Sequence, residues 1–262
     1  MSSAIREPAV AGMFYPDDPE ALHAAVHHWL EEHRSADPPP KAVIAPHAGY
    51  MYSGAIAASA YARVANGRGT ITRVVLLGPS HRVPVEGLAA SGAHAFRTPL
   101  GLVPVDTGAL QSVLSLPQVQ RIESAHAYEH SLEVHLPFLQ EALGKFSLVP
   151  LVVGDASAED VAEVLDRLWD GPETLIVVSS DLSHYHDYQT ARRLDQATSN
   201  AILALKPEAI HYEQACGRNP VNGLLLAARR HGLHAELLDL RNSGDTAGPR
   251  DQVVGYGAYV FH

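Results

Sequence analysis

The residues Thr174–Ser179 have the sequence TLIVVS and lead directly into the polar stretch Ser180-Asp181-Leu182-Ser183-His184. A short apolar run bounded by polar residues is typical of a strand that is buried on both faces of a parallel sheet. The same pattern occurs at Lys41–Ala45 (KAVIA) and at Arg73–Leu77 (RVVLL), and polar loops follow both runs. The three runs therefore predict central, parallel strands.

Segments with helical periodicity or small-residue composition alternate with these runs. Asp18-Pro19-Glu20 is a typical helix start, since aspartate caps free N–H groups and proline suits the first helical position. Further helices are expected at Ser53–Val64, Thr107–Leu116, His130–Leu143, Ala158–Trp169, Gln189–Leu205 and Val221–His231, and further strands at Phe146–Val153, Ala235–Leu240 and Val253–Phe261. Strands that alternate with helices predict an α/β fold with three αβα layers. Its central sheet would be mainly parallel, with antiparallel strands at the edges.

Composition narrows the class of protein. The chain has 262 residues, of which 46% are hydrophobic, and we expect one domain over residues 1–262. A net charge of −10 disfavours binding to nucleic acid. The single cysteine excludes an intrachain disulfide, and we find neither a signal peptide nor an apolar run long enough to cross a membrane. These features indicate a cytoplasmic protein with no membrane association.

Histidines and an aspartate follow the three predicted central strands. His47 follows the first strand, His81 the second, and Asp181 with His184 the third. Ligands bind at the carboxyl ends of strands in such sheets, so these side chains are expected to share a pocket. Two histidines with an anionic ligand suit Fe(II) that binds substrate and O₂, and they equally suit Zn²⁺ that activates water.

Cys216 precedes the helix predicted at Val221, and Arg218 is close to it in sequence. A thiol at a helix N-terminus beside an arginine should have a lowered pKa, and the thiolate form binds metals. The alternative is a buried, inert cysteine, which is common for a lone cysteine in a reducing compartment.

The segment Glu129–Pro137, with the sequence EHSLEVHLP, is dense in titratable groups but lacks the HExxH spacing of zinc peptidases. At helical spacing Glu129 and Glu133 share one face, which would form either a solvated charged surface or part of the pocket. In the second case one histidine of the segment, with His130 as our candidate, would be an acid/base group or line the pocket. The chain has no Walker A loop, no GxGxxG and no GxSxG motif.

Five ordered motifs, with matching segments near both ends of the chain, make the sequence similar to the Memo family, whose prokaryotic members are labelled AmmeMemoRadiSam system protein B. The motifs are Ala45-Pro46-His47-Ala48-Gly49-Tyr50, Gly78-Pro79-Ser80-His81, Glu129–Pro137, Ser179–His184 and Cys216-Gly217-Arg218. The family's fold is similar to that of class III extradiol dioxygenases, which are non-haem Fe(II) enzymes.

The resemblance implies that His47, His81 and Cys216 are the metal ligands. It also implies that Asp181 and His184 lie in the same pocket, with His184 as the candidate acid/base group. Together with His130 from the Glu129–Pro137 segment, these residues are the catalytic candidates. The extradiol enzymes use two histidines and a glutamate, whereas this chain offers Cys216. A softer thiolate shifts metal preference towards Zn or Cu(I).

We therefore expect a metal-binding protein of the non-haem Fe(II), dioxygenase-like oxidoreductase type, acting on a small aromatic or chelating substrate. Fe(II) is the expected metal, with Cu or Zn as alternatives. The alternative functions are a non-catalytic ligand- or peptide-binding module and a metal-dependent hydrolase. The family label further implies AMMECR-like and radical-SAM proteins as partners.

Overall fold

The computed structural model describes residues 5–262. The strands are β1 (Ile5–Arg6), β2 (Ala42–Ala45), β3 (Arg73–Pro79), β4 (Leu88–Ala90), β5 (Ala95–Thr98), β6 (Gly101–Pro104), β7 (Val119–Arg121), β8 (Ser147–Val153), β9 (Thr174–Ser179), β10 (His184–His186), β11 (Ala235–Asn242) and β12 (Val253–Phe261). The α-helices are α1 (Pro19–Glu32), α2 (Tyr50–Ala65), α3 (Thr107–Val113), α4 (Ser124–Ala127), α5 (Leu136–Leu143), α6 (Ala158–Arg167), α7 (Tyr188–Leu203) and α8 (Arg218–Arg230).

The main sheet has the strand order β10-β12-β2-β9-β3-β8-β4-β7, and β11 pairs with β12. Its centre, β2-β9-β3-β8, is parallel, and every residue of β2 and β9 is buried. Antiparallel pairing occurs towards both ends of the sheet, where β12 pairs with β2 and β4 with β8. The predicted α/β fold with a mainly parallel sheet and antiparallel flanking strands is confirmed.

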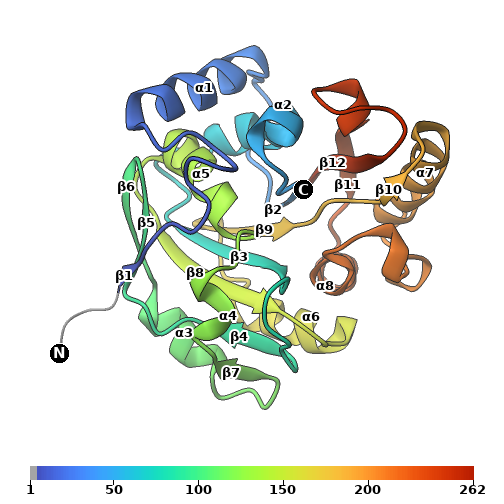
Figure 1. Cartoon of the computed structure of the whole chain (residues 1–262). Helices are drawn as coiled ribbons and strands as arrows, with labels where there is room; N and C mark the ends of the chain where they lie inside the picture. The colour runs from blue at the N-terminus through green and yellow to red at the C-terminus, as the bar shows by residue number, and fades with distance from the viewer. Residues whose placement is uncertain (1–4) are drawn as a thin grey trace.

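Helices cover the sheet as separate groups (Figure 1). Helices α1, α2 and α5 contact one another, and α2 packs on β2 and β12. Helices α6 and α8 form a second group, in which α8 packs on β3 and β9. Helix α7 packs against β11 and β12. None of the helices within residues 5–262 combines the length and hydrophobicity needed to cross a bilayer.

Most predicted elements are present, with boundaries that differ by a few residues. Asp18 caps α1 as expected, since its side chain accepts the Ala21 N–H. The helix predicted at His130–Leu143 is wrong at its start, because a 3-10 turn (η1, Glu133–His135) precedes α5. The helix predicted at Val221 begins three positions earlier, at Arg218, so Cys216 lies immediately before its Gly217 N-cap.

Candidate metal centre

The sheet topology brings the predicted side chains together at one edge. Strands β2, β9 and β3 are adjacent and parallel, so the loops after them, which carry His47, Asp181 and His81, begin at the same edge of the sheet. These loops line an open cavity of about 1370 Å³. Its walls contain all six residues that the sequence singled out, namely His47, His81, His130, Asp181, His184 and Cys216.

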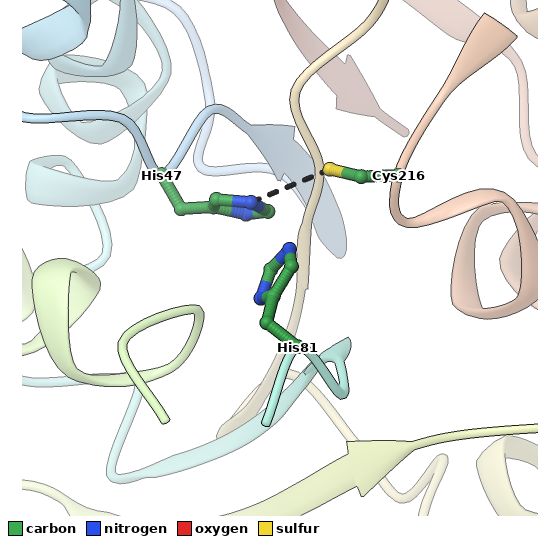
Figure 2. A group of neighbouring side chains, drawn as sticks. All are labelled: His47, His81 and Cys216. Carbon is green, nitrogen blue, oxygen red and sulfur yellow. Dashed lines mark hydrogen bonds between the residues drawn. The ribbon is translucent and has the colours of Figure 1, made fainter. Parts of the chain in front are cut away.

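Three of these side chains form a compact cluster. One potential ligand atom from each of His47, His81 and Cys216 lies within 4.8 Å of the other two. Figure 2 shows the three side chains pointing towards one another from separate loops. The Cys216 Sγ lies 3.3 Å from the His47 Nε2. Because the three residues are distant in sequence, they come together only through the pairing of the strands and the packing of α8 on the sheet.

The orientation of His47 is fixed by a serine. The His47 Nδ1 lies 2.6 Å from the Ser179 Oγ, and that hydroxyl donates to the Ser131 carbonyl at 2.6 Å. A serine hydroxyl has one proton, so it accepts the hydrogen bond from a protonated His47 Nδ1. The Nε2 therefore carries the lone pair that faces Cys216. Burial holds the pKa of His47 well below its ordinary value, so the ring is neutral.

A buried carboxylate orients His81 in the same way. The Glu129 Oε1 lies 2.8 Å from the His81 Nδ1, and the Oε2 accepts the His81 backbone N–H at 2.6 Å. Burial raises the pKa of Glu129, but the hydrogen bonds and charge of His81 outweigh it and lower the value to about 2. The ionised carboxylate thus holds the proton on Nδ1 and leaves Nε2 as a potential ligand, an arrangement typical of metal-binding histidines.

The structure decides the open question about Glu129 and Glu133. Both residues are fully or almost fully buried, so the solvated charged face is wrong. The sequence predicted no specific partner for Glu129, and it gave Ser179 a place in a motif but no role at the site. A serine that ends an apolar strand is too common a feature to predict a contact with His47.

The expectation of a lowered thiol pKa at Cys216 is also wrong. Burial, together with the neighbouring carboxyl of Asp181, raises the pKa of the thiol well above its ordinary value. The contacts from the Asp181 and Gly217 backbone N–H groups and the Ser180 hydroxyl oppose this rise without cancelling it. A protonated thiol can donate to the His47 Nε2, and a cation in the cluster would displace that proton.

A close backbone approach places Cys216. The Cβ of an alanine at Gly217 would lie 2.5 Å from the Ser179 carbonyl oxygen and 2.7 Å from the Ser180 Cβ. Glycine at this position lets the start of α8 touch the end of β9. This contact brings the thiol next to His47.

We expect metal-free Cys216 to react slowly with iodoacetamide, because the thiolate is the reactive form and burial disfavours it. At pH 8, alkylation of chelator-treated native protein should be at least about tenfold slower than alkylation of the guanidinium-unfolded chain. Mass spectrometry of timed samples measures both rates. Equal rates in the two states would show that the folded environment leaves the thiol unperturbed.

The remaining candidates surround the cluster. The Asp181 Oδ1 accepts the His47 backbone N–H at 2.8 Å, and burial raises the pKa of Asp181 to about 7. The His184 Nδ1 lies 2.8 Å from the Leu182 carbonyl oxygen, and burial lowers the pKa of this ring. His130 stacks on His81 with ring centroids 4.6 Å apart, and burial lowers its pKa to about 4. At neutral pH both imidazoles are neutral, and the Asp181 carboxyl is partly protonated.

The chain is similar to known proteins over almost its whole length. The family model for Memo-like proteins matches residues 6–260. A MEMO1 family protein from Aquifex aeolicus is 37% identical over 268 residues, covering 98% of this chain and 99% of the relative. A MEMO1 family protein from Aeropyrum pernix is 39% identical over 279 residues, with coverages of 97% and 98%. The solved structure of uncharacterized protein JW3007 from Escherichia coli K12 is similar in fold, with a TM-score of 0.57, 12% identity, and coverages of 84% and 98%.

Proposed function

The chain belongs to the Memo family, and from this premise we propose that it is a metal-binding protein whose ligands are the His47 Nε2, the His81 Nε2 and the Cys216 Sγ. One observation carries the proposal: both Nδ1 atoms are engaged by other side chains, and the cluster's ligand atoms lie within 4.8 Å of one another. Orientation by a hydrogen-bonded Nδ1 is what metal-binding histidines require. The donor set of two imidazoles and a thiol fits a mononuclear transition-metal ion.

The finer proposal is a non-haem iron oxidoreductase that acts on a small aromatic or chelating substrate. Three protein ligands leave coordination positions free, and the cluster faces a cavity large enough for substrate and co-substrate. When bound, Fe(II) would supply the redox chemistry between substrate and O₂. Zinc and copper are the alternative metals, because thiolate is a soft ligand.

The chain's own groups would move protons in this cavity. A neutral His184 that donates from Nδ1 to the Leu182 carbonyl keeps Nε2 free to accept a proton from a substrate hydroxyl. Asp181, with a pKa of about 7, would take or release a proton near neutral pH. His130 lies over the His81 ring and would pack against a bound substrate as well as limit water.

The cellular location of the protein is proposed from its sequence, and its partners are proposed from the family resemblance. A single cysteine and the absence of disulfides suit a cytoplasmic protein. AMMECR-like and radical-SAM proteins are the proposed partners, because the prokaryotic family label joins the three.

Elemental analysis of protein purified without oxygen tests the proposal. We expect about one iron per chain, and Fe(II)-loaded protein should consume O₂ faster than the His47→Ala variant across a panel of catechols and other chelating substrates. Zinc at this stoichiometry, with ester or amide hydrolysis, would replace the redox function by a hydrolytic one. No metal even after anaerobic loading would overturn the metal proposal and leave a binding module.

A further inference from the structure

A carboxylate outside the cavity contacts the segment that carries Asp181 and His184. Asp195 lies on α7, its residue is only 3% exposed, and no cationic side chain within residues 5–262 forms an ion pair with it. Burying an unpaired carboxylate is costly, so its hydrogen bonds must offset that cost. The Asp195 Oδ1 accepts the backbone N–H of Ser183 at 3.0 Å.

The backbone of β12 closes around this carboxylate. The Cβ of an alanine at Gly255 would lie 2.1 Å from the Asp195 Oδ2, so only glycine leaves room there. Gly255 also forms two backbone hydrogen bonds with Leu182 and Ser183. Its N–H donates to the Ser183 carbonyl at 2.8 Å, and its carbonyl accepts the Leu182 N–H at 2.8 Å. Asp195 and Gly255 together bond the N–H groups of Leu182 and Ser183 and the Ser183 carbonyl.

This arrangement reaches the cavity through one more hydrogen bond. The Leu182 carbonyl is the group that the His184 Nδ1 contacts at 2.8 Å. A rotation of the Leu182–Ser183 peptide would move that carbonyl and release the imidazole ring. The Ser183 N–H belongs to this same peptide unit, and the Asp195 carboxylate holds it.

We propose that Asp195 is a positioning residue that fixes the Leu182–Ser183 peptide, and through it keeps the His184 Nδ1 bonded and the Nε2 free for proton transfer in the cavity. The catalytic meaning of this rests on the proposed function, but the positioning itself is independent of the metal. Asp195 neither lines the metal cavity nor contacts His47, His81 or Cys216.

Two variants separate the hydrogen bond from general stability. Asp195→Ala removes the acceptor, whereas Asp195→Asn keeps an oxygen that can accept the Ser183 N–H. Ser199→Ala is the matched control, because it removes a fully buried hydroxyl on the same helix that forms no hydrogen bond with residues 181–184. Gly255→Ala is a second route, since its Cβ would displace the Asp195 carboxylate.

Amide hydrogen exchange at Ser183 and ¹⁵N NMR of the His184 ring are the readouts, measured on the metal-free full chain. In Asp195→Ala and Gly255→Ala, exchange at Ser183 should accelerate by at least about tenfold, and the His184 ring should lose its Nδ1–H tautomer. Asp195→Asn should restore most of both signals, and Ser199→Ala should leave them unchanged. Zn²⁺ binding, used as the metal probe, should stay at the same stoichiometry in all four variants.

The proposal is overturned if Asp195→Ala keeps the wild-type tautomer and slow exchange, or if Asp195→Asn and Ser199→Ala disturb both signals as much as Asp195→Ala does. If Asp195→Ala does not fold, the other two variants carry the test. Gly255→Ala should then lose the slow exchange at Ser183 and the Nδ1–H tautomer of His184, and Asp195→Asn should keep both. Failure of the wild-type chain to bind Zn²⁺ or iron would count against the proposed function and leave the positioning result intact.

Discussion

Replacing His47 by alanine is expected to weaken metal binding by more than about 100-fold, because mutating even the outer partners of metal ligands typically weakens binding by about 10–100-fold. His47 provides a buried, neutral Nε2 whose ring is held by Ser179. His81→Ala should have an effect of the same size. Cys216→Ser should be milder and should favour harder metals, since a hydroxyl replaces a thiol.

Competition with a chromophoric chelator measures these affinities, and thermal unfolding gives a second readout. Metal at about 100 times its Kd should raise the free energy of unfolding of the wild-type protein by about 2.7 kcal/mol, and the His47→Ala protein should show no such rise. His28→Ala is the matched control, because that imidazole is 68% exposed on α1. If both His47→Ala and His81→Ala bind the metal with wild-type affinity, these histidines are not its ligands.

Replacing Glu133 by alanine is expected to lower the free energy of unfolding by about 3–5 kcal/mol, which is the usual cost of removing one partner of a buried ion pair. Glu133 is fully buried and pairs with Arg6, which is also buried. Its carboxylate further accepts the Ala9 and Val10 backbone N–H groups at 2.8 and 3.0 Å and the Tyr15 hydroxyl at 2.6 Å. The variant leaves the Arg6 charge without its carboxylate partner and removes the acceptor of the Ala9, Val10 and Tyr15 donors.

Chemical denaturation measures this loss, and the melting temperature should fall by about 6–20 °C. Glu7→Ala provides the control in the same N-terminal segment. Glu7 pairs with Arg97 through side chains that are 62% and 43% exposed, so its loss should cost at most about 1 kcal/mol. A cost for Glu133→Ala as small as that for Glu7→Ala would mean that the buried network contributes little.

The central strands were predictable because their signal is local. Every residue of β9 is buried, so each had to be compatible with the interior, and the TLIVVS pattern follows directly. The start of α5 was less predictable. The side chains of Glu133 and Glu129 form buried contacts with the N-terminal segment and with His81, respectively. Because these partners are distant in sequence, their contacts override the local helical preference of residues 129–135.

The candidate site likewise has features that the sequence predicts and features that depend on the tertiary structure. The sequence alone determined which side chains follow the strand ends, and therefore that His47, His81, Asp181 and His184 face one edge of a parallel sheet. Only the tertiary structure decided the protonation of these groups. The pKa of Cys216 was expected to fall from its position near a helix start, yet burial beside Asp181 raises it. The positions of strand ends follow from local patterns, whereas burial and hydrogen-bond partners depend on residues such as Ser179, Glu129 and Asp195 that only folding brings close.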